Sequence, residues 1–447
     1  MNGAVPEIRV RQLNGGEPNP AGGFVLYWMT SYRRTRFNFA LERSAEWAAH
    51  FGVGVVVLEA LRCDYRWASD RFHRFVLDGM QDNLEALSAR RGVTYFPYVE
   101  TEAGGGRGLL EALASEAAVV VTDDYPTFFI PSMLAAAASR LSVRLEAVDS
   151  NGLHPVRATA KTYLTAYSFR RYLQKTLPAH LETLPVVDPV SALEGFAAPA
   201  LAESVLHRWP DASPWLTSVG SDLSELPIDH SVEPAEIRGG ARAARARLEA
   251  FLGRKLTGYP EDRNQPDEDA ASGLSPYLHF GHISTHEILE ALAEHEGWRP
   301  DFEGRPTLGK RTGWWGTSAA AEAFLDQLVT WRELGFNMAA NRPDHREYDS
   351  LPEWARVTLA DHASDPRPHL YSLEQLEAAT TDDEIWNAAQ RQLRREGIIH
   401  NYLRMLWGKR ILEWTESPVE AARVMIEINN RYALDGRDPN SYSGIYW

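Results

Sequence analysis

The stretch 24–60, "FVLYWMTSYRRTRFNFALERSAEWAAHFGVGVVVLEA", decides the fold of the first third of this chain. It begins with the apolar run 24–30 and ends with the run 52–60, and both runs have the length and the β-branched and aromatic residues of buried strands. Segment 39–51 between them has the apolar spacing of an amphipathic helix. A strand, a helix and a second strand in this order predict a βαβ unit with parallel strands.

The same pattern continues along the next ninety residues. Three further short, apolar strand candidates follow at 92–100, 117–124 and 142–150. Five strands separated by helices predict a doubly wound parallel sheet, with any ligand at the carboxyl ends of the strands. We therefore expect an α/β domain over residues 23–155, preceded by a flexible arm over residues 1–22.

The sequence changes character in its second half. Residues 156–235 are rich in Pro, Ala and Ser and predict a long linker between domains. Beyond them no run resembles a strand and helix start signals are frequent, such as the capping box of Ser417 and Glu420 with Pro418 at the first helical position. The predicted fold class is an α/β domain with a doubly wound parallel sheet, followed by a large all-α domain over 236–447.

Composition and missing motifs exclude several classes of function. No apolar run of about 18 residues occurs, which argues against a membrane span, and a single cysteine, Cys63, excludes a disulfide framework and a Cys-rich zinc site. We expect a cytoplasmic protein without a metal centre. His286 and Glu287 begin an HExxH-like string, but residue 290 is Glu, and neither a P-loop nor a Gly-x-Ser-x-Gly elbow occurs. The net charge of −15 argues against unspecific nucleic-acid binding but is compatible with a local basic groove.

Two tryptophans in the string "NYLRMLWGKRILEW" (401–414) raise the first question about function. Trp407 and Trp414 are seven residues apart, so on a helix they lie about 10 Å apart on one face. Large apolar residues at this spacing usually belong to a core, and the pattern alone leaves open whether these two have a chemical role. Arg404 on the same helix needs a charged partner if it is buried, and Asp435 is a candidate.

Two other groups in the helical half are open to two interpretations each. The Ser-Gly-Leu-Ser-Pro turn 272–276 could hold a phosphate with its backbone N–H groups, or Ser275 could simply cap a helix. Gln327 and Trp331, at positions i and i+4, could form a platform for a flat ring, or could be a surface residue and a core residue.

Several long strings in one order are similar to those of the photolyase/cryptochrome family, and specifically to its class II cyclobutane pyrimidine dimer photolyases. The resemblance covers about residues 23–447 and is strongest after residue 255. The matching strings are "VLYWMTSYRRTRFNFAL" (25–41), "YPEDRNQPDEDAASGLSPYLHFGHIS" (259–284), "FLDQLVTWREL" (324–334), "EIWNAAQRQL" (384–393), "IHNYLRMLWGKRILEWTESPVEAA" (399–422) and "NNRYALDGRDPNSYSGIYW" (429–447).

The resemblance implies a helical domain that holds FAD in a U shape. It implies that Arg404 and Asp435 form an ion pair beside the flavin ring and that Asn429 faces the reactive central nitrogen of that ring. A neutral amide there can stabilise the reduced flavin without demanding one protonation state. A second, antenna chromophore of unspecified chemistry is implied in the N-terminal domain. The residues implied in holding the FAD phosphates are Tyr259 and the turn of Ala271, Ser272, Gly273, Leu274 and Ser275.

In class II members an electron reaches the flavin along three tryptophans, and the residues that match them are Trp407, Trp386 and Trp414. Trp386 comes from another helix and would bridge the other two, which brings each step near van der Waals contact. The resemblance therefore favours an electron path over an inert core. The implied reaction is light-driven: excited reduced FAD gives an electron to a pyrimidine dimer, the cyclobutane ring splits, and the electron returns.

Damaged DNA is the partner that the resemblance implies. The dimer must flip out of the duplex to reach a flavin inside the protein, and a lesion that pairs badly flips at low cost. The residues that match the family's lesion contacts are Trp331 and Trp447, which embrace the dimer, and Arg263 and Asn264, which lie near the lesion and its strand. We expect a monomer without membrane association.

Two features depart from the family pattern. Gln327 stands where the family has a glutamate that hydrogen-bonds a dimer base, and an amide cannot supply a proton, so we expect slower repair. The sequence also ends at Trp447, whereas class II chains continue with a basic, aromatic segment, so we expect either that the sequence is incomplete or that DNA binding is weaker. Both features favour an alternative, a cryptochrome-like blue-light photoreceptor, while Trp331, Arg263 and Asn264 favour repair. A third alternative, a flavoprotein unrelated to light, has no distinguishing feature in the sequence.

Overall fold

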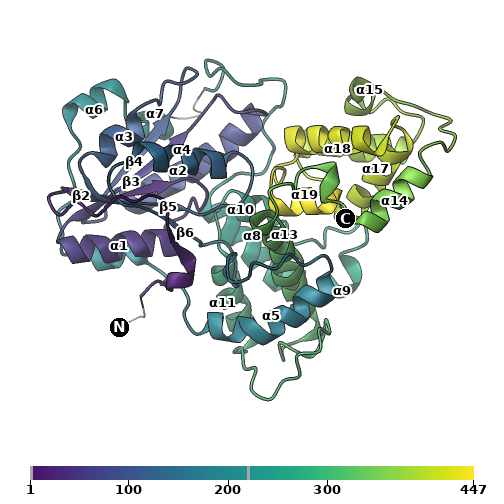
Figure 1. Cartoon of the computed structure of the whole chain (residues 1–447), viewed down its shortest axis with the longest axis horizontal. Helices are drawn as coiled ribbons and strands as arrows, with labels where there is room; N and C mark the ends of the chain where they lie inside the picture. Colours follow the sequence, from purple (N-terminus) through teal and green to yellow (C-terminus); the bar gives the residue numbers. More distant parts are fainter. Residues whose placement is uncertain (1–3, 219–221, 447) are drawn as a thin grey trace.

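A computed structural model describes residues 4–218 and 222–446 of the chain. Figure 1 shows an N-terminal sheet flanked by helices and a C-terminal part built from helices. One six-stranded sheet runs in the order β1-β6-β5-β2-β3-β4, and all neighbouring strands are parallel except β1 and β6. The predicted doubly wound sheet is therefore confirmed. Its strands are β1 (Val10–Gln12), β2 (Phe24–Met29), β3 (Gly54–Leu61), β4 (Val93–Val99), β5 (Ala117–Asp123) and β6 (Leu145–Val148).

The helices of the N-terminal half alternate with these strands and then continue without them. The first set is α1 (Phe39–Phe51), α2 (Asp70–Leu87), α3 (Leu109–Ala114), α4 (Ile130–Arg140), α5 (Ala166–Leu181), α6 (Glu203–Arg208) and α7 (Ser213–Thr217). The second set is α8 (Ala241–Arg254), α9 (Tyr259–Asp262), α10 (Ser275–His279), α11 (Thr285–Glu296), α12 (Ala319–Leu325), η3 (Asp326–Trp331), α13 (Arg332–Asn341), α14 (Glu353–Asp361), α15 (Leu373–Ala378), α16 (Glu384–Glu396), α17 (Asn401–Glu413), α18 (Pro418–Tyr432) and α19 (Pro439–Ile445).

The sixth strand comes from the segment 1–22, whose sequence predicts a flexible arm. That prediction is wrong for β1, because Val10 pairs with Val148 at the edge of the sheet. Arg9, just before β1, is buried, and its Nη2 donates to the carbonyl oxygen of Leu153 at 2.8 Å. An open sheet edge and a buried guanidinium therefore fix a segment that has no strand signal of its own.

Helices cover both faces of the sheet. Val25 and Tyr27 of β2 pack in one buried cluster with residues of α1, whereas Leu26 and Trp28 pack on the other face with residues of α3 and α4. Successive side chains of a strand point to opposite faces, and both faces here are apolar because both carry a helix layer.

The rest of the described chain is helical. After Val148 no further strand occurs in the described residues. An isolated bridge outside the sheet pairs Ser69, which precedes α2, with Asp229. The predicted linker 156–235 contains α5, and Phe169 and Leu173 of this helix pack into the core of the C-terminal helices. None of the described helices is long and apolar enough to cross a membrane.

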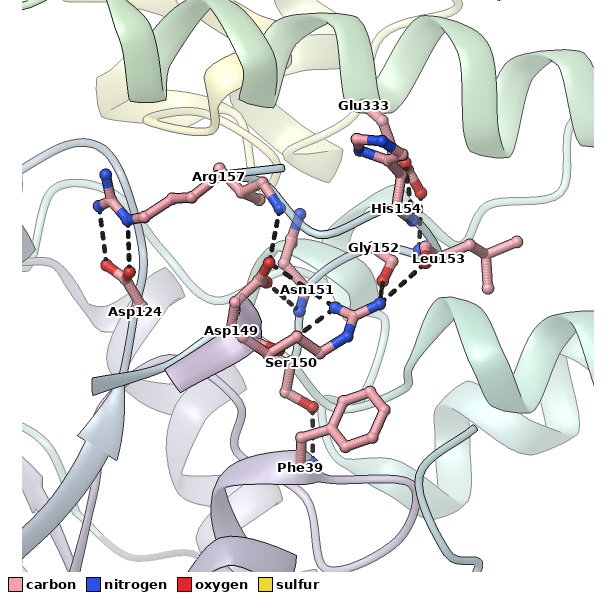
Figure 2. A network of polar contacts seen from close by, with 12 residues as sticks. Phe39, Asp124, Asp149, Ser150, Asn151, Gly152, Leu153, His154, Arg157 and Glu333 are labelled. Atoms are coloured by element: carbon pink, nitrogen blue, oxygen red, sulfur yellow. Dashed lines mark hydrogen bonds and ion pairs between the residues drawn. The ribbon is translucent and has the colours of Figure 1, made fainter. Parts of the chain in front are cut away.

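The segment that follows β6 joins the two parts through a polar network (Figure 2). One carboxylate, that of Asp149, accepts the N–H of Val156 at 2.6 Å, and another, that of Glu333 on α13, accepts the N–H groups of Leu153 and His154 at 2.7 and 3.1 Å. Burial raises the pKa of Glu333 to about 8. The loop after the sheet is therefore bonded directly to the helix that follows η3.

Candidate functional site

Three indoles from two helices lie in contact in the C-terminal part. Trp386 lies on α16, Trp407 on α17, and Trp414 at the end of α17. The rings of Trp386 and Trp407 are parallel with centroids 6.3 Å apart, and the ring of Trp414 lies edge-on to Trp386 at 5.5 Å. All three side chains are buried. The structure therefore brings the three predicted tryptophans together, with Trp386 in the middle, while their role in electron transfer stays a prediction.

Hydrogen bonds of the indole N–H groups fix this arrangement. Nε1 of Trp386 donates to the carbonyl oxygen of Trp407 at 3.1 Å, and Nε1 of Trp407 donates to Oε1 of Gln390 at 2.9 Å. Gln390 is fully buried one turn after Trp386, and its place in the site was not predicted from the sequence. On the other side, the ring of Tyr371 lies edge-on to Trp414 at 5.3 Å. These indoles also belong to a hydrophobic core, so the core interpretation holds as well.

An ion pair and a hydroxyl group join three segments near these rings. Arg404, one turn before Trp407 on α17, donates from Nη2 to Oδ1 of Asp435 at 3.0 Å. The hydroxyl of Ser275 donates to Oδ2 of the same carboxylate at 2.8 Å. The predicted pairing of Arg404 with Asp435 is therefore present. Nε of Arg404 is buried without a hydrogen-bond partner among the described residues, which leaves one cationic donor free at this point.

Asn429 on α18 belongs to the same group of polar contacts. Its Nδ2 donates to the hydroxyl of Ser441 at 3.2 Å, and that hydroxyl donates to the carbonyl oxygen of Asp435 at 2.8 Å. Gly436 is required between them, because a Cβ on this residue would lie 2.7 Å from the carbonyl oxygen of Asn429. The close approach of this turn to α18 therefore brings Asn429 and Asp435 together.

The turn 271–275 precedes the short helix α10. Arg247 on α8 holds it from the side by donating from Nε to a carbonyl oxygen of the turn at 2.8 Å. Gly273 has a φ of +65°, which glycine adopts without strain. The N-cap interpretation of Ser275 is wrong, because Leu274 holds the cap position without a side-chain hydrogen bond and the Ser275 hydroxyl binds the carboxylate described above. A guanidinium beside small residues and a hydroxyl is a favourable setting for an anion.

Gln327 and Trp331 lie on η3, between α12 and α13. Their spacing predicts an ordinary helix, whereas this segment has the wider π-helical form, which is rare and frequent at functional sites. Gln327 is half-buried and Trp331 is 36 % exposed, so the core interpretation of Trp331 is wrong. Trp447, the other predicted lesion contact, lies outside the described residues.

Buried polar contacts hold both ends of η3. Asp326 accepts from Nε and Nη2 of Arg170 on α5 at 2.7 and 3.0 Å, and both side chains are buried. Directly after η3, Nη2 of Arg332 donates to Oδ1 of Asn151 at 2.6 Å. These residues were not predicted from the sequence, although an aspartate in the apolar string 324–331 was a signal, because a charge at a core position needs a partner.

Tyr259, Arg263 and Asn264 lie at and just after α9. Tyr259 is buried against Phe251 and Phe324, with ring centroids 5.4 and 5.8 Å away. The guanidinium of Arg263 lies 5.8 Å from the centre of the Tyr259 ring, and Asn264 is exposed. Since α9 packs against α12, which leads into η3, the predicted lesion contacts come from neighbouring elements.

A separate cavity of about 440 Å³ lies at the carboxyl ends of β2 to β5. Its walls include Trp28, Tyr98 and Phe129, and the glycine-rich loop 104–108 lies at one side. Tyr259 and Asn429 do not line it, so it is distinct from the site around Arg404. The sequence predicted a ligand site at this edge of the sheet, and a volume of this size suits a small organic molecule.

Known proteins place the chain among the photo-lyases, although no family model matches it. It is 33 % identical to the deoxyribodipyrimidine photo-lyase of Methanothermobacter thermautotrophicus over 445 residues, which span 98 % of this chain and 89 % of that relative. It is also 33 % identical to the photo-lyase of Oryza sativa subsp. japonica, over 98 % of this chain and 82 % of the relative. This chain belongs to the deoxyribodipyrimidine photo-lyase family.

Two further comparisons agree with membership in the photo-lyase family. The photo-lyase of Potorous tridactylus is 30 % identical over 94 % of this chain and 73 % of its own length. A bacterial class III photolyase from Agrobacterium tumefaciens has the same fold, with a TM-score of 0.62 over 95 % of this chain and 79 % of that chain at 19 % identity. The family resemblance of the motif strings and the predicted enzyme class, a photo-lyase, are confirmed.

Proposed function

We propose that this member of the photo-lyase family repairs cyclobutane pyrimidine dimers in DNA with light and bound FAD. The observation that supports this most directly is the contact chain of Trp414, Trp386 and Trp407, which ends one helical turn from Arg404. Aromatic rings in van der Waals contact suit electron transfer, and this chain joins Trp414, the most exposed of the three, to the polar group around Arg404.

The residues around Arg404 fit a dinucleotide such as FAD. When bound, FAD supplies light absorption and a transferable electron. The buried, unpartnered Nε of Arg404 offers a charge-assisted hydrogen bond, and Asn429 offers an amide whose Nδ2 makes contacts of 3.2 Å to the Ser441 hydroxyl and 3.5 Å to Oδ1 of Asn430. Arg247 and the turn 271–275 offer positive charge and hydroxyl groups for the phosphates. One chain supplies all of these groups, so we propose that a monomer is sufficient.

The proposed DNA site lies around η3. Trp331 presents a partly exposed indole on which a flipped-out base can stack, and Gln327, one turn earlier, can donate a hydrogen bond to it. Arg263 and Asn264 on the neighbouring α9 loop can contact the strand that carries the lesion. With a net charge of −15, the chain depends on such local contacts rather than on its overall field to bind DNA.

The cavity at the carboxyl ends of β2 to β5 is the proposed site of the antenna chromophore. Its aromatic walls suit a conjugated ring, and His279 and Arg437 bring the C-terminal helices to its edge. A chromophore there would therefore lie between the sheet and the proposed flavin site.

Irradiation of the flavin-loaded protein with a dimer-containing oligonucleotide tests the proposal. We expect the thymine absorbance to recover in the light and to stay unchanged in the dark. Trp331→Ala is expected to weaken binding of the damaged oligonucleotide and to leave flavin content unchanged. Absorbance that fails to recover in protein whose flavin responds to light would contradict repair and favour the alternative that Gln327 suggests, a cryptochrome-like photoreceptor.

A further inference from the structure

His400 begins helix α17 and contacts a second element with its other ring nitrogen. As the N-cap residue of α17, it accepts the N–H of Tyr402 on Nδ1 at 3.2 Å. Its Nε2 lies 3.1 Å from the carbonyl oxygen of Arg263, which directly follows α9 and lies 137 residues earlier in the chain. The residue is half-buried. One imidazole therefore joins the first turn of α17 to the loop that follows α9.

The two partners of this ring fix the position of its hydrogen. A backbone N–H can only donate, so Nδ1 of His400 carries no hydrogen. A carbonyl oxygen can only accept, so Nε2 carries the hydrogen and donates it to Arg263. The residues favoured at an N-cap are Ser, Thr, Asp and Asn, which make the first bond with shorter side chains. The feature that histidine adds at this position is the second bond, to the loop.

The loop after α9 has few other contacts at the end that carries the proposed lesion contacts. Asn264 and the five residues that follow it are exposed. Among the described residues, the bond from His400 is the only hydrogen bond that Arg263 or Asn264 receives from outside the segment 259–275. The far end of the loop is held separately, because Asp269 pairs with Arg247 at 3.5 Å. His400 therefore determines how firmly the near end of the loop is held against α17.

The same residue lies at the start of the helix that leads to the proposed flavin site. Its carbonyl oxygen accepts the N–H of Arg404 at 2.8 Å, the first backbone hydrogen bond of α17. We propose that His400 is a positioning residue, whose ring holds the loop of Arg263 and Asn264 against α17 before DNA binds. This inference rests on the proposed roles of these two residues as lesion contacts. A loop that is ordered in advance costs less binding free energy than a loop that the DNA itself must order.

Two amide variants separate the two hydrogen bonds of the His400 ring in the flavin-loaded full chain. In His400→Asn, the amide oxygen can replace Nδ1 as the cap, but the side chain is too short to reach Arg263. In His400→Gln, the amide N–H can replace Nε2, but the cap is lost. Without DNA, we expect hydrogen–deuterium exchange of the backbone amides 263–268 to be faster in His400→Asn than in the native protein, and nearly native in His400→Gln.

Binding of a dimer-containing and of an undamaged oligonucleotide, measured in the dark, tests the consequence for the site. His400→Asn should weaken binding of the damaged oligonucleotide by about threefold to tenfold, the effect of one hydrogen bond, and weaken binding of the undamaged one much less. His400→Gln should keep the native preference for damaged DNA. The number of dimers split per absorbed photon at saturating DNA should stay native in both variants, because bound DNA then holds the loop in place.

Ser372→Ala is the matched control, because Ser372 caps α15 by accepting the N–H of Gln375 at 3.3 Å. It should lower the unfolding midpoint, as His400→Gln does, and change neither the exchange of the loop nor the preference for damaged DNA. Native exchange or native DNA preference in His400→Asn, or an equal loss of preference in the Asn and Gln variants, would overturn the role of His400 and leave the lesion site standing. A native protein that binds both oligonucleotides equally would overturn the inference together with the proposed lesion site.

Discussion

At the scale of single residues, the amide of Gln327 is the group that decides whether the proposed lesion site can donate a proton. It is half-buried on η3, one turn before the exposed ring of Trp331. An amide and a carboxyl group have the same shape, but only the carboxyl group can be protonated and then give up a proton. The difference between them therefore isolates proton donation from hydrogen-bond geometry.

We predict that Gln327→Glu raises the quantum yield of dimer repair by a few-fold. The change keeps the side-chain volume, so binding of damaged DNA should change little. The measurement is the number of dimers split per absorbed photon in flavin-loaded protein, with binding of the same oligonucleotide measured in the dark as the control. An unchanged quantum yield would show that dimer repair does not need a proton donor at this position.

Trp386 is the residue on which the indole chain depends, because it alone contacts both other rings. We predict that Trp386→Phe strongly slows photoreduction of the flavin, since a phenyl ring is far harder to oxidise than an indole. Because an aromatic ring is retained, the stability loss should stay below the about 3–5 kcal/mol typical of truncating a buried Trp to Ala. Flash absorption of the flavin measures the first effect, and chemical unfolding measures the second.

Trp354→Phe is the matched control for this variant, because Trp354 is 73 % exposed on α14, outside the cluster. The flavin of the Trp354→Phe variant should be photoreduced at the native rate. A native rate in Trp386→Phe would show that the three rings are only a packed core.

At the scale of elements, η3 shows how a short helix can be held in an uncommon form. Its first residue forms a bidentate buried ion pair with Arg170, and the residue after its end binds Asn151. Single-turn π segments are rare within helices, and these contacts from other elements hold both ends of this one. The proposed lesion contacts Gln327 and Trp331 therefore owe their placement to α5 and to the loop after β6.

We predict that Asp326→Asn destabilises the protein by about 3–5 kcal/mol, the range found when one partner of a buried ion pair is removed. Asn keeps the shape but leaves the buried guanidinium of Arg170 uncompensated. Chemical unfolding followed by tryptophan fluorescence measures the loss. Asp349→Asn, which breaks an exposed pair with Arg356, should change stability by less than about 1 kcal/mol. Equal effects of the two changes would contradict a special role for the buried pair.

At the scale of the whole molecule, the network in Figure 2 joins the sheet to the helical part. Glu333 accepts two N–H groups from the loop after β6, and burial raises its pKa to about 8, from an ordinary value of 4.5. Between these two pH values the folded protein holds a proton that the unfolded chain has lost. The contribution of Glu333 to the free energy of unfolding therefore falls as pH rises from about 4.5 to 8 and is constant outside this window.

We predict that Glu333→Gln removes part of this pH dependence, since glutamine imitates the protonated carboxyl group at every pH. In measurements at several pH values between 5 and 8, the unfolding free energy of the variant should rise relative to that of the native protein as pH increases. The exposed Glu294→Gln should leave the slope unchanged. Parallel curves for native protein and Glu333→Gln would show that this carboxyl group is ionised throughout the range.

Local patterns in the sequence predicted those features that need only a few neighbouring residues. The five parallel strands follow from apolar runs of the right length, and the start of α18 follows from Ser417, whose hydroxyl accepts the N–H of Glu420 at 3.2 Å. The capping box is incomplete, because the Glu420 carboxylate pairs with Arg423 instead. The pairing of Arg404 with Asp435 was also predictable, since a charge placed in an apolar helix requires an opposite charge.

By itself, then, the sequence determined five of the six strands, the helical character of the second half, the family and the identity of the three tryptophans, because periodicity and collinear motifs are properties of the chain alone. Only the tertiary structure decided that residues 10–12 close a sheet edge, that η3 is π-helical, and that Arg437 lies unpaired in a cavity wall. The first two features depend on groups more than a hundred residues away, and the third depends on the absence of a hydrogen-bond partner for a buried nitrogen. No local pattern in the sequence encodes such distant partners.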